Sequence, residues 1–172
     1  MAKSDSFFIR AILTVDNSET FQQTTIPLGS YVDALGQAVL RIHNVEYEWI
    51  NTANFKAPFM SPNQAGYANC QITTQTQTGL VSLDNKSVAF KSQLWARNPD
   101  ASQNPPTQVY NDSHAPQHFT NGYLVAVETL YLGGQADASW IHDIDLGVAV
   151  VLECTVEKMS QAAAMALALS QQ

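Results

Sequence analysis

The residues best suited to metal chemistry are His114 and His118, which lie four positions apart. On an α-helix this spacing places two imidazoles on one face, where they can bind zinc together. Pro116 lies between them, and a proline-rich stretch precedes them, so a helix is disfavoured here. We interpret the pair as part of an exposed loop and predict no metal site.

A second polar cluster, His142, Asp143 and Asp145, precedes the last apolar segment. A calcium site needs about six oxygen ligands or more, and only two carboxylates are local here. The cluster is typical of a turn at the end of a strand. We therefore expect it to shape the backbone and to bind no cation.

Glu46 and Glu48 lie on one face of a strand-like run, and paired carboxylates can do acid–base work on a sugar. They alternate with Val45, Tyr47 and Trp49, so in a strand they occupy the opposite face from these apolar side chains. That arrangement indicates a solvent face. The sequence also lacks a nucleophile elbow, a phosphate-binding glycine loop and a His-Glu-x-x-His motif. We predict no catalytic residue, no cofactor, no small-molecule substrate and no enzymatic activity.

Three tryptophans suggest an alternative function, a carbohydrate-binding, lectin-like β-sandwich. Such a module needs exposed aromatic rings. Trp49 and Trp95 lie among apolar neighbours and are expected in the core, whereas Trp140 follows a loop and is the best candidate for exposure. A metal-dependent cupin-type enzyme is a further alternative. Such an enzyme needs histidine and carboxylate ligands inside the barrel. Of the four histidines only His43 lies in a long strand-like run, and no His-x-His pair is present, so the sequence offers little support for it.

The element that organises the chain is the long strand-like run at residues 38–50, AVLRIHNVEYEWI. Leu40 and Ile42 have one parity, whereas Val45, Tyr47 and Trp49 have the other. A regular strand cannot bury both sets on one side, because its side chains alternate between two faces. A β-bulge near His43 and Asn44 would shift the alternation by one residue, so that the apolar side chains of both halves of the strand face the core.

Other strands are predicted on both sides of this run. The segment at 68–78 is rich in Thr and Gln, which suits a solvated face or an edge, and the segment at 122–132 is expected to be one central strand that ends at Gly133-Gly134. The remaining expected strands cover residues 7–15, 20–28, 80–83, 87–97, 138–142 and 146–156.

Two long connections separate these strands. Residues 51–66 carry Phe55, Phe59 and Met60, which either cover the end of a barrel or contact a neighbour. Residues 98–121 contain four prolines and are expected to be irregular, with a short strand at Val109 and Tyr110 as an option. We predict both connections as contact loops.

The C-terminal residues 160–172, SQAAAMALALSQQ, contain no β-branched side chain and favour a helix capped by Ser160. A helix this short must dock on its own domain, on a neighbouring subunit or on a membrane surface. The lack of basic residues after Lys158 gives the membrane alternative no support. We divide the chain into a domain at 1–158 and a helical assembly arm at 159–172, and expect the arm to be needed for assembly and dispensable for folding.

Composition limits the partners. Only 13% of the 172 residues are charged, against about 25% in typical domains, so the surface is rich in short polar groups that cost little to desolvate. The net charge of −7 and the scattered basic residues argue against direct contact with nucleic acid.

Cys70 and Cys154 lie in strand-like runs and are expected to be buried free thiols, although a disulfide bridge between them stays an open alternative. The N-terminus does not read as a signal peptide, which predicts synthesis in the cytoplasm.

The pattern of strands without βαβ alternation predicts an all-β, antiparallel fold, most economically an eight-stranded jelly-roll sandwich with a short C-terminal α-helix. An immunoglobulin-like sandwich does not match the Cys–Trp–Cys spacing. The whole chain resembles the single jelly-roll major capsid proteins of icosahedral viruses, and in size and style those of tailless, membrane-containing bacterial and archaeal viruses.

This resemblance implies a structural protein of the virion that self-assembles into an icosahedral shell. It also implies a homo-oligomer that associates with other capsid subunits through its loops and terminal segments. The chain lacks the basic N-terminal arm of many capsid proteins that touch the genome, which suits either a shell separated from the genome by another layer or an acidic outer component of the particle.

Overall fold

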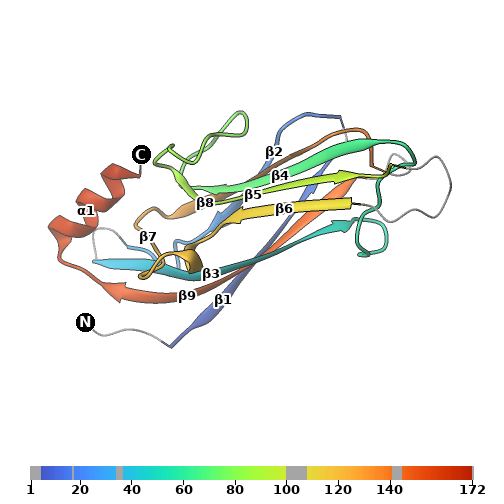
Figure 1. Ribbon diagram of the computed structural model, residues 1–172. Coiled ribbons are helices and arrows are strands. Elements are labelled where there is room, and N and C mark those ends of the chain that lie inside the picture. Colours follow the sequence, from blue (N-terminus) through green and yellow to red (C-terminus); the bar gives the residue numbers. More distant parts are fainter. Residues whose placement is uncertain (1–4, 17, 34–36, 100–107, 141–144, 172) are drawn as a thin grey trace.

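The computed structural model describes residues 5–16, 18–33, 37–99, 108–140 and 145–171, which form a two-layered β-sandwich with one α-helix at its end (Figure 1). The strands are β1 (Phe7–Val15), β2 (Gln22–Pro27), β3 (Ala38–Asn51), β4 (Ala65–Thr73), β5 (Val88–Arg97), β6 (Gln108–His114), β7 (Tyr123–Val125), β8 (Thr129–Ala136) and β9 (Leu146–Lys158). A 3-10 turn, η1 (Pro116–His118), follows β6, and the helix is α1 (Gln161–Ser170).

The strand order identifies the fold. One sheet has the order β1-β9-β3-β7 and the other β2-β8-β4-β5-β6. Early strands pair with late ones, β1 with β9, β2 with β8 and β3 with β7, always antiparallel. The chain is thus a long antiparallel ribbon rolled up so that successive pairs alternate between the two sheets, which is the jelly roll. The predicted fold class is confirmed, and β6 adds one strand at the edge of the second sheet.

The bulge predicted in the long strand is present. Ile42 pairs with Cys154 and Asn44 with the adjacent Glu153, so His43 is the extra residue. Leu40 and Ile42 before the bulge and Val45 and Trp49 after it are all buried. The bulge therefore places both apolar sets of β3 in one core.

The segment predicted as a single strand at 122–132 is two strands. β7 pairs with β3 in the first sheet, and β8 lies between β2 and β4 in the second, so the chain crosses between the layers at residues 126–128. Gly133 and Gly134 do not end β8 but lie within it. The Phe21 ring occupies the space beside Gly133, and Val15 occupies the space beside Gly134. Apolar residues on both faces gave the appearance of one continuous central strand.

The polar strand β4 was expected at an edge or with a solvated face, and this was wrong. It lies between β8 and β5, with Gln71 and Thr73 fully buried. The connection at residues 74–87 supplies polar partners, because Gln71 Nε2 donates to the Gly79 carbonyl (3.1 Å) and Gln71 Oε1 accepts from the Val81 amide (2.9 Å). This connection also contains residues 80–83, which form no strand.

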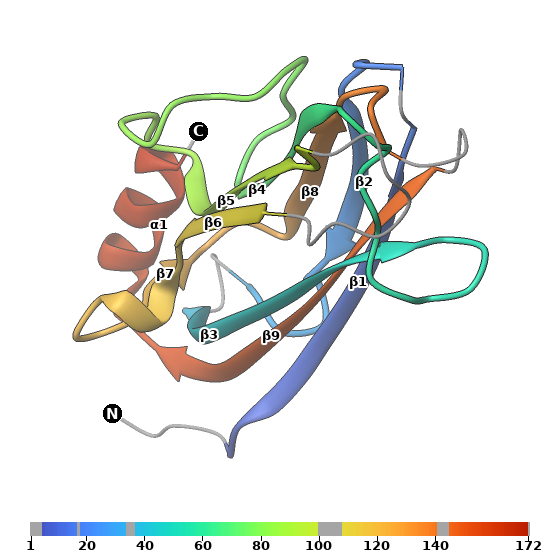
Figure 2. The same ribbon diagram turned by 45° about the vertical axis from the view of Figure 1, so that its right-hand side comes forward.

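The helix begins as predicted, with Ser160 Oγ accepting from the Ala163 amide at 3.3 Å. It docks on its own sandwich, where Ala164 packs with Val39 and Ala126. The Gln171 side chain fixes the helix end, since it accepts from the Ala126 amide (3.0 Å) and donates to the Leu124 carbonyl (2.6 Å). Figure 2 shows α1 at the end of the sandwich opposite the β3–β4 connection.

Both cysteines are buried free thiols, as predicted. Cys70 on β4 and Cys154 on β9 belong to the main core between the sheets. Burial raises the pKa of the Cys154 thiol to about 12, and it raises the pKa of Cys70 as well. Neither thiol is poised for reaction.

Candidate assembly surface at the β3–β4 end

The two connections predicted as contact loops meet at one end of the sandwich. The Asn98 amide donates to the Gln64 carbonyl (2.8 Å), and Asn98 Nδ2 donates to the Met60 carbonyl (3.3 Å). Met60 is buried and also forms a β-bridge with Trp140. The first connection thus covers the core at this end through Met60, and it is tied to the start of the second.

The first connection also holds an aromatic side chain in solvent. Asn51 organises a tight turn, in which its carbonyl accepts from the Phe55 amide (2.8 Å) and its side chain from the Ala53 amide (2.8 Å). Phe55 has a positive φ of 58°, and its side chain is 71% exposed. Phe59 is exposed as well. The sequence left open whether Phe55, Phe59 and Met60 cover the core or contact a neighbour. Met60 covers the core, whereas both phenylalanines are exposed and available to a neighbour.

The second connection contributes the edge strand β6. The sequence allows a short strand at Val109 and Tyr110, and the observed strand is longer, from residue 108 to residue 114. Tyr110 pairs with Trp95 on β5, and both side chains are exposed, at 61% and 44%. Val109 is exposed as well, but it pairs with the buried Ala96 and so lies on the opposite face of β6 from Tyr110. We call Phe55, Phe59, Trp95, Val109 and Tyr110 the aromatic end.

Two tryptophan assignments were wrong. Trp95 was expected in the core, but it faces solvent because its neighbours Leu94 and Ala96, of the opposite parity, are buried in the core. Trp140 was expected to be exposed, but it is buried, and its Nε1 donates to the Tyr67 carbonyl at 3.1 Å. The alternation of side chains along the strand is a sufficient sequence signal that Trp95 faces outward. The lectin-like alternative depended on an exposed Trp140 and loses that support.

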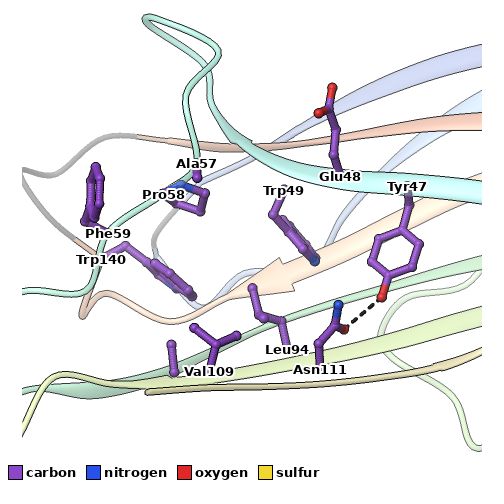
Figure 3. A pocket seen from close by; sticks show the side chains of 11 residues that line it. Tyr47, Glu48, Trp49, Ala57, Pro58, Phe59, Leu94, Val109, Asn111 and Trp140 are labelled. Atoms are coloured by element: carbon purple, nitrogen blue, oxygen red, sulfur yellow. Dashed lines mark hydrogen bonds between the residues drawn. The ribbon is translucent and has the colours of Figure 1, made fainter. Parts of the chain in front are cut away.

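A pocket of about 520 Å³ lies within the aromatic end, between the two sheets (Figure 3). Tyr47 Oη donates to Asn111 Oδ1 (2.8 Å) across the pocket, from β3 to β6. Its walls are mainly apolar and include Trp49, Phe59, Leu94, Val109 and Trp140. The Glu48 side chain points away from it.

The polar groups singled out from the sequence do not converge. His114 ends β6 and His118 lies in η1, so the two do not share a helix. His43 contacts Thr155 Oγ1 through Nε2 at 2.9 Å. Asp145 precedes β9 and is exposed, whereas His142 and Asp143 lie outside the described residues. Within the part of the chain that the structure describes, no three His, Cys, Asp or Glu residues are grouped so as to hold a metal ion.

Glu46 and Glu48 lie on the outer face of β3 and are exposed, as predicted. Asn44 Nδ2 donates to Glu46 Oε1 at 3.1 Å. The shallow groove beside them is completed by Tyr47, Ala149 and Val151 and has a volume of about 210 Å³. The two carboxylates therefore belong to a solvated sheet face.

Comparisons with known proteins were made for the sequence and for the fold. No family model matches the sequence, and no curated protein is significantly similar to it. Among the described residues, no helix has both the length and the apolar character needed to span a membrane.

Several solved structures have a similar arrangement of strands. A chain of Cocksfoot mottle virus aligns with a TM-score of 0.43 and 9% identity over 94% of this chain and 98% of the viral one. A chain of Desmodium yellow mottle tymovirus aligns with a TM-score of 0.39 and 10% identity over 89% of this chain and 87% of the viral one. VP1 from the unassembled pentamer of Merkel cell polyomavirus aligns with a TM-score of 0.40 and 10% identity over 92% of this chain and 98% of VP1. The assignment of the fold rests on the strand order given above.

Proposed function

We propose that this protein is a structural subunit of a viral capsid that self-assembles into an icosahedral shell through the aromatic end. The observation that carries the proposal is the exposure of Phe55, Phe59, Trp95, Val109 and Tyr110 at one end of a jelly roll. Clustered exposed apolar side chains mark interaction sites in soluble proteins. The role is mechanical, and the protein is not an enzyme.

The chemistry of the aromatic end suits a protein interface. Tyrosine and tryptophan are enriched among the residues that dominate binding energy, because they bury large areas with few rotatable bonds. The Trp95–Tyr110 pair occupies the sheet edge, since β6 is the outermost described strand of its sheet. An edge strand offers backbone groups to a neighbour in addition to its side chains.

Shell formation follows from repetition of this contact. A surface with few charges loses little hydration when it is covered. Symmetry then repeats the same contact around a closed particle, so that a weak pairwise affinity yields a stable assembly.

The finer features of the proposal come from the sequence. We place the protein in the virion, made in the host cytoplasm, alongside other capsid subunits and without direct contact with nucleic acid, in keeping with the net charge of −7. From the resemblance of the sequence alone, we further propose that it belongs with the capsid proteins of tailless, membrane-containing bacterial and archaeal viruses. Residues 159–172 form an assembly arm that contacts a neighbour through Met165 and Leu169, which are exposed on the outer side of α1.

The test is a pair of substitutions at the sheet edge. In the double variant W95S/Y110S we expect the mass measured by sedimentation to fall toward that of a monomer at concentrations where the wild type associates. The matched control is Phe8→Ser, which removes an exposed aromatic ring from β1 in the other sheet. Equal association of W95S/Y110S and the wild type would refute the assignment of the interface.

A further inference from the structure

Trp49 carries a buried hydrogen-bond donor that no described residue satisfies. The residue is 8% exposed, and its Nε1 has no hydrogen-bond partner among the described residues. Buried indole N–H groups normally find an acceptor, because they otherwise lose hydration without compensation. Trp140, on the other side of the same pocket, satisfies this rule by donating to the Tyr67 carbonyl. The difference between the two rings points to an acceptor that the described residues do not supply.

The Trp49 donor is directed into the pocket. Figure 3 shows the indole nitrogen on the side facing Leu94 and Asn111 of the opposite sheet. The Asn111 side-chain oxygen accepts from Tyr47 Oη (2.8 Å) and Ser92 Oγ (3.3 Å), and its amide nitrogen lies on the side nearer the Trp49 ring. Two N–H donors thus border the same space. The volume of about 520 Å³ falls in the range of small-molecule sites.

The walls define the chemistry of an occupant. Trp49, Phe59, Leu94, Val109 and Trp140 present apolar surface, and the nearby Glu48 points outward. A charged ligand would lose its hydration here without a counter-ion. The occupant must therefore be neutral and mainly apolar, with one oxygen that accepts a hydrogen bond.

We propose that this pocket binds a small neutral molecule with an apolar, ring-containing body and a carbonyl-type oxygen that accepts from Trp49 Nε1. The site is a function beyond assembly, and its occupancy is measured separately from the mass of the particle. Because the pocket opens at the aromatic end, binding is measured at protein concentrations below those at which the wild type associates.

The test compares two matched probes, benzophenone and diphenylmethane, which differ in the presence of the carbonyl oxygen. Both are titrated into the full-length protein, with the affinity measured by calorimetry and the site located by the indole N–H signals of the three tryptophans. We expect benzophenone to bind about five to ten times more tightly than diphenylmethane, the gain typical of one hydrogen bond. The Trp49 signal should move, whereas that of the outward-facing Trp95 should not.

Three variants separate the hydrogen bond from the cavity. Trp49→Phe should abolish the preference for benzophenone while diphenylmethane still binds, and the Trp95 and Trp140 signals report that it remains folded. Val109→Trp, at the exposed rim, should weaken both probes. Trp95→Phe, on the outer face of β5, should leave both affinities unchanged.

Several results would overturn the proposal. Equal affinity of the two probes for the wild type would remove the role of the Trp49 donor, and no binding of either would remove the site. A Trp49 signal that shifts with protein concentration in the absence of a probe would assign the pocket to a second copy of the chain instead.

Discussion

Arg41 on β3 and Glu157 on β9 form a two-point ion pair, with Nε 2.7 Å from Oε1 and Nη2 2.8 Å from Oε2. The Glu157 side chain is only 4% exposed, and the hydrogen bond to it raises the pKa of Arg41. Arg41 Nη1 also donates to the Asn121 carbonyl, so one guanidinium joins two strands of the first sheet to the connection that leads into β7.

Arg41→Met should therefore destabilise the protein strongly, by about 3 kcal/mol in the free energy of unfolding, because it removes the guanidinium that forms a two-point pair with a buried carboxylate. The double variant R41M/E157L removes both charges and should recover part of this loss. Urea unfolding followed by circular dichroism measures both values. A double variant no more stable than R41M would show that the ion pair is not the source of the effect.

Gln171 is predicted to anchor the C-terminal helix. Its side chain bonds to the Ala126 amide and the Leu124 carbonyl, and its own carbonyl accepts from Thr74 Oγ1 at 2.8 Å. Gln171→Ala leaves the Ala126 donor buried and unpaired, so the unfolding free energy should fall by about 1–3 kcal/mol. Gln161→Ala, at the exposed start of the helix, is the control and should change stability little. Similar unfolding midpoints for the two variants would contradict the anchoring role.

The docking of α1 changes how its part in assembly must be tested. Deleting residues 160–172 would also uncover Val39 and Ala126, so a loss of assembly would not separate folding from contact. The variant M165S/L169S alters only exposed side chains of the helix. We expect it to keep the wild-type melting temperature and to associate more weakly in sedimentation. Wild-type association would remove the outer face of the helix from the proposed contacts.

Gly122 should be intolerant of any side chain. Its φ is +62°, and a Cβ atom built there would collide with the Ile42 carbonyl. We expect Gly122→Ala to cost at least about 1–2 kcal/mol, since an L-residue is strained in this conformation even without a clash. Gly79→Ala is the matched control, because nothing lies within 4 Å of its added Cβ. Thermal melts of the two variants that coincide would rule out this account of the turn.

The buried thiols should make stability depend on alkaline pH. Desolvation raises the pKa of Cys154 to about 12, with a smaller contribution from the charge of Glu153, whereas the pKa of a thiol in an unfolded chain is ~8.5. Because the folded pKa is the higher one, this contribution is fully present below pH ~8.5 and is lost as the pH rises from there toward about 12.

The comparison that isolates this effect is the wild type against Cys154→Ala. The loss of unfolding free energy between pH 8 and pH 10 should be smaller in the variant. In the same experiment, a thiol reagent at pH 8 should label neither cysteine until the protein is unfolded. Rapid labelling of the native protein would contradict the burial of the thiols.

Much of the sandwich could be predicted because its strands alternate cleanly. β1 has the predicted bounds, and the bulge in β3 followed from two apolar sets of opposite parity. The helix start followed from Ser160 and the loss of β-branched residues. Each of these signals is local, so the sequence carries it without reference to the rest of the fold.

Apart from the position of Trp95, which the alternation along β5 indicates, the errors came from features that depend on tertiary context. The crossing at residues 126–128 joins β7 and β8, whose side chains are apolar on both faces and hide the break. Gln71 is buried because a distant connection satisfies its amide, which no local pattern reveals. The pocket was not predicted either, since it requires Trp49, Leu94 and Val109 from three separate strands.

The most direct test of the account is the mass of the purified protein in solution, measured by light scattering over a series of protein and salt concentrations. We expect discrete oligomers or particles that persist at high salt, because the proposed interface is aromatic and poor in charge. Those particles can then be imaged for a closed shell. A strict monomer at every concentration and salt condition would contradict self-assembly through the aromatic end.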